Sequence, residues 1–136
     1  MNREAIEKKA AKILEYAATL ESLSGNCVER MKNDKLYRGA VLYFLYMMAD
    51  SCVALAEMMI KFKNLRSPQS YSEAIDILGE HQIIPAAFAY DFAKIAGFRN
   101  FLAHDYEKTN YEEICQIMLD KLEDVKKYIG FVESSL

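Results

Sequence analysis

A strong cation, an amide, an imidazole and a phenol converge between positions 99 and 106. They belong to Arg99, Asn100, His104 and Tyr106. On a helix, Asn100 and His104 are one turn apart and share a face, while Arg99 and Tyr106 lie seven residues apart on a neighbouring stripe. Arginine is a permanent, fork-shaped ligand for phosphate, and histidine is well suited to move protons near neutral pH. Together these residues suit chemistry on a phosphodiester.

The composition indicates a single domain spanning residues 1–136. The chain is 52% hydrophobic and 27% charged, with only two prolines, which is ordinary for a globular protein and unlike a disordered chain. Its net charge of −3 argues against a broad basic surface that coats nucleic acid. Any contact with nucleic acid must therefore be local, within a cleft.

The cysteines are odd in number and widely spaced, at Cys27, Cys52 and Cys115. We therefore expect three reduced thiols in a reducing cytoplasm. Three scattered cysteines and two histidines offer no standard zinc spacing, so we expect neither a metal site nor a cofactor. The sequence Met1–Ala5 alternates charged and apolar residues and shows no secretory signal.

The segment 39–60 is apolar except for Asp50, Ser51 and Glu57, and it is nearly as long as a membrane span. Two carboxylates in that span would be costly in lipid. We therefore expect no membrane association, and we interpret the segment as a central helix covered by its neighbours or by a second subunit. Asp50 needs a partner there, and both a structural hydrogen bond and a role in a site remain open.

The apolar residues recur every three or four positions throughout, which predicts an all-α antiparallel bundle of four long helices and one short helix. The first helix ends at Gly25. Asn33 or Asp34 caps the second, which runs to about residue 64. Ser70 and Glu73 form a capping box that begins the short third helix.

The remaining helices frame the polar segment. Pro85 suits the first turn of a fourth helix, which leads directly into residues 99–106. Asn110 with Glu113 caps the last helix, whose apolar stripe runs from 114 to 132. Gly97 lies within the fourth helix, where glycine costs about 1 kcal/mol relative to alanine. It indicates either tight helix packing or room for a ligand or a partner's backbone.

These residues resemble the HepT-like HEPN proteins, whose signature is Arg-x4-His-x-Tyr with a polar residue after the arginine. Further segments are similar to the family's patterns, and the likeness extends in order from about residue 35 to 130. Two positions depart from it: Ala54 stands where many relatives have an acidic residue, with Asp50 one turn earlier, and Ala103 stands where valine is more common. The similar segments are 97–106, 52–56, 68–73, 77–78 and 108–112.

The resemblance implies a fold, an assembly and an activity. It implies an all-α HEPN bundle, a homodimer with the motif lining the interface cleft, and a metal-independent RNA endonuclease. It also implies that the protein is the toxin of a pair with a minimal nucleotidyltransferase antitoxin. In such pairs the partner transfers AMP to the tyrosine that matches Tyr106, which silences the toxin.

The residue chemistry fits this implication. RNA supplies its own nucleophile, so cleavage needs a base, an acid and a cation for the charged phosphorane. Arg99 would hold the phosphate, His104 would act as base or acid, and Asn100 would orient the imidazole or the phosphate, leaving a 2′,3′-cyclic phosphate. One histidine cannot easily do both proton transfers, and His81 reads as a solvated turn residue. A two-fold dimer would supply a second His104.

Two other classes of function remain open. One is a catalytically idle HEPN module that binds a nucleotide or a partner at Arg99 and serves as subunit for a nucleotidyltransferase. The other is a purely structural bundle subunit. A ribonuclease needs Arg99 and His104 on one open groove, a binding module needs only Arg99, and a structural subunit would bury the motif.

Overall fold

The computed structural model describes residues 2–104, 107 and 110–136, and these form seven α-helices and no strand. The fold is therefore all-α, as the periodicity predicts. The helices are α1 (Arg3–Leu23), α2 (Cys27–Asn33), α3 (Lys35–Phe62), α4 (Tyr71–Glu80), α5 (Ala86–Phe92), α6 (Lys94–His104) and α7 (Tyr111–Ser134).

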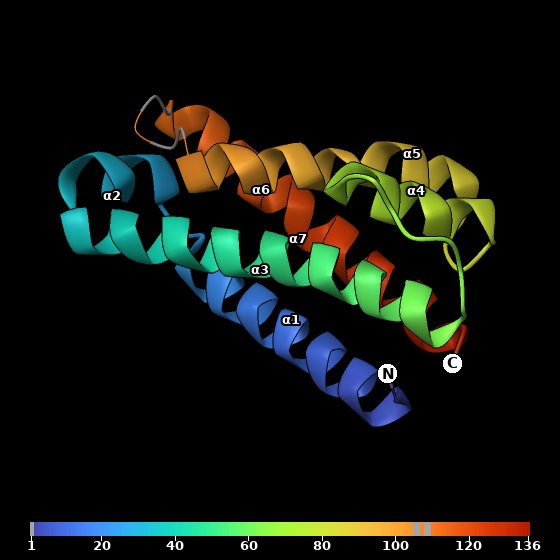
Figure 1. Ribbon diagram of the computed structural model, residues 1–136. Helices are drawn as coiled ribbons and strands as arrows, with labels where there is room; N and C mark the ends of the chain where they lie inside the picture. The colour runs from blue at the N-terminus through green and yellow to red at the C-terminus, as the bar shows by residue number, and fades with distance from the viewer. Residues whose placement is uncertain (1, 105–106, 108–109) are drawn as a thin grey trace.

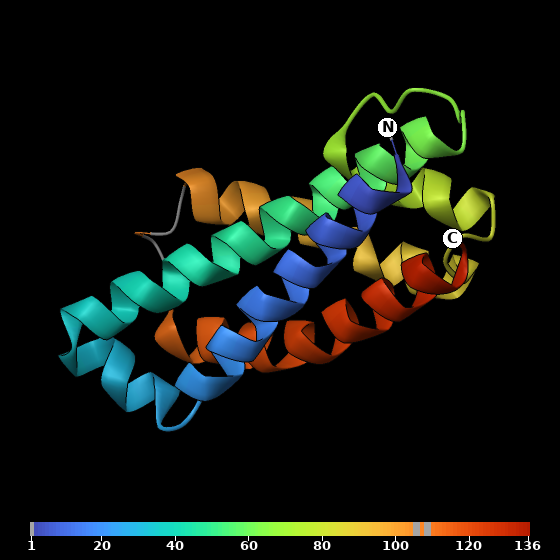
Figure 2. The ribbon, with the colours of Figure 1, turned by 90° about the horizontal axis from the view of Figure 1, so that it is seen from below.

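Helix α3 is the centre of the bundle. It packs against α1, α2, α4 and α6, while α7 packs against α1 and α2. Figure 1 shows α1 crossing one side of α3, with α4, α5 and α6 on the other side. Seen from below, α1 runs between α3 and α7 (Figure 2). The face of α3 that carries the candidate site residues is thus turned toward α6.

The helix caps follow the local sequence. Asp34 caps α3, where its Oδ1 accepts hydrogen bonds from the amides of Leu36 and Tyr37 at 3.1 Å each. Ser70 caps α4 by accepting from the amide of Glu73 at 3.1 Å. Asn110 caps α7 through the amides of Glu112 and Glu113. These starts agree with the sequence prediction because a cap needs only neighbours along the chain.

Two parts of the helical pattern differ from the prediction. The short helix α2 follows Gly25 and precedes the long central helix, with Asn26 in the left-handed backbone region at φ 56°. The expected fourth helix is divided into α5 and α6 at Ala93. There the Ala96 amide bonds to the Ala93 carbonyl at 3.1 Å, three residues back instead of four. At the other end of α5, Pro85 lies at the cap position, just before the first turn.

Helix α3 is the one described helix long and apolar enough to cross a membrane. The same property suits the core helix of a bundle. Its residues Leu45, Cys52, Leu55 and Met59 are completely buried against the other helices. Half of the most apolar stretch of α3 is buried in this way.

The expectation of three reduced thiols is corrected by the structure. Cys27 at the start of α2 and Cys115 in the second turn of α7 form a disulfide, with their Cα atoms 6.0 Å apart. Cys52 remains a free thiol in the core, where burial raises its pKa. The pairing is hidden in the sequence because the two cysteines are 88 positions apart and meet only when α2 packs on α7.

Candidate active site

Arg99 on α6 is held against α3 by hydrogen bonds. Its Nε donates to Asp50 Oδ1 at 2.9 Å, and its Nη2 donates to the hydroxyl of Tyr46 at 3.1 Å. Its Nη1 donates to Asn100 Oδ1 at 3.1 Å. A guanidinium carries five N–H donors, so these contacts fix Arg99 and still leave donors for a phosphate.

The environment keeps Arg99 charged. The hydrogen bond to Asp50 raises the pKa of Arg99, partial burial opposes that rise, and electrostatic interactions with Tyr46 and Asp50 add to it. The Arg99 side chain is only 16% exposed, whereas Asp50 is 42% exposed. The Asp50 carboxylate, left open by the sequence, is therefore the ion-pair partner of the motif arginine.

Two tyrosine rings flank the guanidinium. Its central carbon lies 5.3 Å from the ring centroid of Tyr46 and 4.9 Å from that of Tyr71, within the range of cation–π contacts. Tyr46 comes from α3 and Tyr71 from the first turn of α4. Arg99 therefore lies where three helices meet.

The other motif residues lie toward the end of α6. Asn100 and His104 are both exposed, one turn apart, and His104 is the last residue of the helix. The structure thus brings Arg99 and Asn100 into contact and places His104 on the same face as Asn100. Tyr106, the predicted modification site, lies outside the described residues.

Two hollows border this site. The first, of about 430 Å³, is lined by α3 and the end of α6 through Gly39, Leu42, Tyr43, Tyr46, Leu102 and Ala103. The second, of about 390 Å³, is lined by Glu57, the segment 68–71 and Asn100. Tyr46 belongs to the first and Tyr71 to the second, and both rings contact Arg99. The arginine therefore lies between two open spaces.

Gly97 does not mark tight packing within this chain. It is exposed, and a Cβ added there would meet no atom within 4 Å. The interpretation that remains is free space on the face that Gly97 shares with Asn100 and His104.

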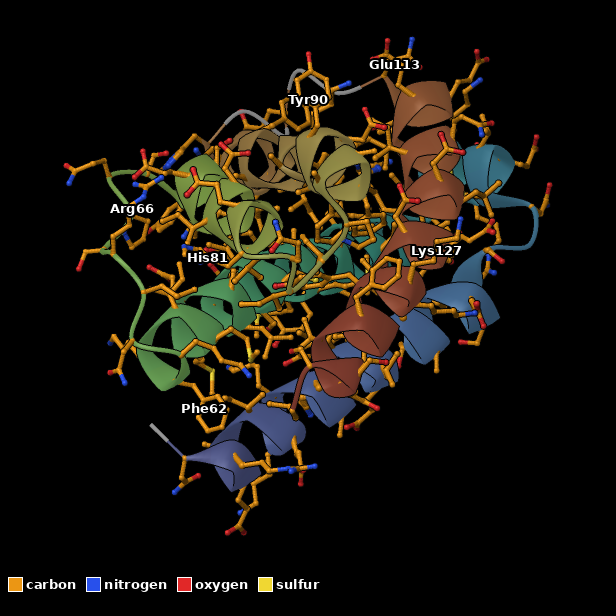
Figure 3. All side chains as sticks on the ribbon, turned by 90° about the vertical axis from the view of Figure 1, so that its right-hand side faces the viewer. Phe62, Arg66, His81, Tyr90, Glu113 and Lys127 are labelled. Carbon is orange, nitrogen blue, oxygen red and sulfur yellow. A yellow bond between two sulfur atoms is a disulfide. The ribbon has the colours of Figure 1, made fainter. Side chains whose placement is uncertain are left out.

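His81 is far from the site. It follows α4 as an exposed turn residue, at the end of the molecule that faces the viewer in Figure 3. Helix α6 runs away from that end toward α2 (Figure 1), and its last residue is His104. His81 therefore cannot supply a second imidazole beside Arg99 within one chain.

Tyr46 and Tyr71 were not predicted as site residues from the sequence. A signal existed for the first: Tyr46, Asp50 and Glu57 are four and seven residues apart and line one stripe of α3. No comparable pattern marks Tyr71, because its contact with Arg99 depends on how α4 packs. Within the described ranges, no three His, Cys, Asp or Glu residues are grouped to hold a metal ion.

Comparison with known proteins identifies a family that covers most of the chain. The family model described as "Ribonuclease HepT-like" matches residues 13–132 of this chain. The mRNA nuclease HepT of Shewanella oneidensis is 23% identical over 105 residues, which cover 77% of this chain and 79% of that protein.

Solved structures share the fold. One is the tri-AMPylated HEPN toxin of Shewanella oneidensis in complex with the MNT antitoxin, with a TM-score of 0.86, 23% identity and coverage of 98% of this chain and 99% of that one. Another is a cytosolic protein of unknown function, YutE of Bacillus subtilis, with a TM-score of 0.86, 17% identity and coverage of 100% and 91%.

Proposed function

This chain belongs to the HepT-like ribonuclease family, and from that premise we propose that it is a metal-independent RNA endonuclease. It acts as the toxin of a pair with a minimal nucleotidyltransferase antitoxin. The observation that carries the proposal is the Arg99 guanidinium, fixed by Asp50 and Tyr46. It contacts Tyr46, which lines the first hollow, and Asn100, which lines the second. His104 ends the same helix five residues later. The proposed location is the cytoplasm, where its RNA substrate would be.

The proposed reaction is an internal transfer within RNA. The 2′-oxygen attacks the adjacent phosphorus, its proton passes to a base, the P–O5′ bond breaks, and an acid protonates the leaving 5′-oxygen. Arg99 binds the phosphate oxygens and stabilises the charge that grows on them. His104 makes one of the two proton transfers, either from the 2′-hydroxyl or to the leaving 5′-oxygen. Asn100 holds the Arg99 guanidinium in place. The products are a 2′,3′-cyclic phosphate and a 5′-hydroxyl.

Asp50 and Tyr46 are positioning residues in this proposal. They fix two edges of the Arg99 guanidinium, so that its remaining donors point in one direction before RNA arrives. Such preorganisation is what makes charge stabilisation effective in a transition state.

A homodimer would supply the second proton-transfer group. Leu36 and Tyr43, seven residues apart on α3, are 86% and 55% exposed. They lie on the helix face that borders the first hollow, near the end of α6 that carries His104. A second copy docked there through a two-fold axis would cover this apolar surface and bring its own His104 to the same cleft.

Tyr106 is the proposed target of the partner. An AMP group on its hydroxyl would place a negative phosphate and a purine near the RNA-binding arginine, blocking substrate. We expect Tyr106→Phe to cleave RNA and to escape this inhibition. Intact mass spectrometry after co-expression with a minimal nucleotidyltransferase antitoxin should show added AMP on the wild type and none on Tyr106→Phe. Neutralisation of an unmodified protein would instead indicate inhibition by occlusion.

The activity is tested by cleavage of RNA in excess EDTA. Cleavage should persist, and His104→Ala or Arg99→Ala should lower the rate by about 100- to 10,000-fold with helicity unchanged by circular dichroism. The matched controls are His81→Ala and Arg3→Ala, both exposed and away from the site, which should cleave like the wild type. Loss of cleavage on chelation, or full activity of His104→Ala, would contradict the proposal.

The alternative function is an idle HEPN module that binds a nucleotide or a partner and serves as subunit for a nucleotidyltransferase. It is favoured by the ion pair with Asp50, which already compensates the charge of Arg99. This alternative predicts that the wild type binds RNA or nucleotide but leaves RNA intact, and that Arg99→Ala abolishes binding whereas His104→Ala does not.

A further inference from the structure

The second hollow has no role in the proposed cleavage step. Its lining residues are Glu57 of α3, Pro68, Gln69, Ser70 and Tyr71 around the start of α4, and Asn100 of α6. We call it the Gln69 hollow. Its volume of about 390 Å³ falls in the range of small-ligand sites, about 300–1,000 Å³. It shares Asn100 and Tyr71 with the surroundings of Arg99, so a ligand in it would adjoin a phosphate bound there.

Tyr71 gives the hollow an aromatic wall. Tyr71 is 41% exposed, although the Arg99 guanidinium lies 4.9 Å from its ring centroid. A ring with accessible surface beside a fixed cation is a stacking platform for an unpaired base, the arrangement by which proteins hold single-stranded RNA.

The remaining walls carry groups that can read the edge of a base. The carboxamides of Gln69 and Asn100 offer both donors and acceptors, whereas the carboxylate of Glu57 only accepts. A carboxylate repels phosphate and pairs with N–H groups, as in recognition of the cytosine amino group. The negative charge of Glu57 thus suits contact with a nucleobase and not with the phosphate backbone of RNA. It favours a base that carries an exocyclic amino group.

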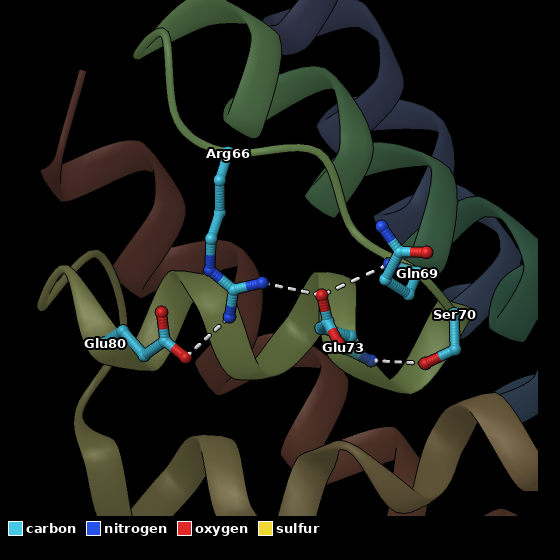
Figure 4. Close-up of polar contacts among 5 residues, drawn as sticks. All are labelled: Arg66, Gln69, Ser70, Glu73 and Glu80. Atoms are coloured by element: carbon cyan, nitrogen blue, oxygen red, sulfur yellow. Dashed lines mark hydrogen bonds and ion pairs between the residues drawn. The ribbon is translucent and has the colours of Figure 1, made fainter.

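The segment that forms one wall is pinned in place. Arg66 reaches from the connecting segment onto α4, donating to Glu73 at 2.6 Å and to Glu80 at 2.8 Å (Figure 4). Glu73 also accepts from the amide of Gln69 at 3.2 Å. These bonds raise the pKa of Arg66, the Glu80 contact most. The wall is therefore formed before a ligand binds, which lowers the entropic cost of binding.

We infer that the Gln69 hollow is a nucleobase subsite. It holds the base of a nucleotide next to the phosphate at Arg99, with Tyr71 stacking on it and Glu57 accepting from its amino group. It therefore prefers cytosine, adenine or guanine over uracil at one position beside the cut. This inference rests on the proposed function in taking RNA as the ligand.

The first test maps cleavage positions in a random-sequence RNA by sequencing the fragment ends. The wild type should show uracil depleted by about tenfold at one position beside the cut. Glu57→Gln should reduce that depletion, and Tyr71→Ala should weaken selectivity more than Tyr71→Phe, which keeps the ring. Glu123→Gln and Gln116→Ala, exposed changes on α7, are the controls and should leave the base pattern unchanged.

The second test does not depend on cleavage. Cytidine and uridine monophosphates differ at positions 3 and 4 of the base, and only cytidine carries an exocyclic amino group. Their dissociation constants, measured by NMR titration, therefore compare a base with the amino group and a base without it. Cytidine monophosphate should bind about tenfold more tightly to the wild type, and Glu57→Gln should bring the two constants together. If no RNA is cleaved but this difference appears, the proposed function fails and the subsite stands. Cleavage without base preference, or equal constants in the wild type, would overturn the subsite.

Discussion

Arg99 is the residue around which the site is built, and two of its three side-chain hydrogen bonds are to residues outside the motif. Asp50 and Tyr46 lie 49 and 53 positions away in the sequence and bind two of its nitrogens. The arginine therefore presents its remaining donors from a fixed position, which is the condition for effective stabilisation of a transition-state charge.

The role of Asp50 is tested by comparing two substitutions. Asp50→Asn keeps an oxygen that can accept from Arg99 Nε, whereas Asp50→Ala removes it. We expect Asp50→Ala to lower kcat by about 100-fold, since misplacement by about 1 Å has that effect, and Asp50→Asn to retain most of the activity. Asp91→Ala, an exposed change on α5, is the control. Equal losses in both Asp50 variants would mean that the negative charge of Asp50 matters, not the position in which it holds Arg99.

At this scale the sequence predicted the motif residues but not their neighbours. Arg99 and Asn100 stand together because they are adjacent, and Asn100 shares a face with His104 because helix geometry requires it. Tyr71 could not be predicted, because its contact with Arg99 requires knowing that α4 packs beside α6. Periodicity gives the stripes of each helix but not which stripes meet.

At the scale of elements, the packing of α4 on α5 depends on Gly79. A Cβ added at Gly79 would lie 2.5 Å from the Cβ of Ala89, whereas one added at Gly97 would meet nothing within 4 Å. We expect Gly79→Ala to destabilise the protein by about 1–3 kcal/mol through overpacking. Gly97→Ala should stabilise α6 by up to about 1 kcal/mol.

Thermal unfolding followed by circular dichroism compares the two glycine variants directly. The expected signs are opposite, a lower Tm for Gly79→Ala and an unchanged or higher Tm for Gly97→Ala. A lower Tm for both would show that Gly97 is packed against something, and a second copy of the chain would then be the first candidate.

Helix starts were predictable because their determinants are local, as the caps Asp34, Ser70 and Asn110 show. The break at Ala93 was not, since no proline or glycine marks it and the apolar stripe continues across it. The disulfide was hidden for a different reason: it depends on a contact between the second helix and the last.

The disulfide is tested by counting thiols. Alkylation of the denatured, unreduced protein should label one cysteine, Cys52, and prior reduction should raise the count to three. Intact mass gives both numbers. Three labelled cysteines without reduction would contradict the disulfide and show that Cys27 and Cys115 are reduced thiols, as their spacing predicts.

At the scale of the whole molecule, the proposed dimer face should be the surface around Leu36 and Tyr43. The wild type should sediment at equilibrium as twice its 15.6 kDa mass at micromolar concentration. Leu36→Glu should shift it toward monomer and lower RNA cleavage, because the cleft would lose its second His104. Leu119→Glu, at a similarly apolar exposed position on α7, should do neither. A monomeric wild type would refute the dimer.

The masses of the RNA fragments test the central claim most directly. In EDTA, the wild type should release fragments that end in a 2′,3′-cyclic phosphate and begin with a 5′-hydroxyl, because the 2′-oxygen is the nucleophile. The same fragments should appear with His81→Ala and be missing with His104→Ala. Fragments with 5′-phosphate ends would show that water attacks the phosphorus, and would contradict the mechanism assigned to Arg99 and His104.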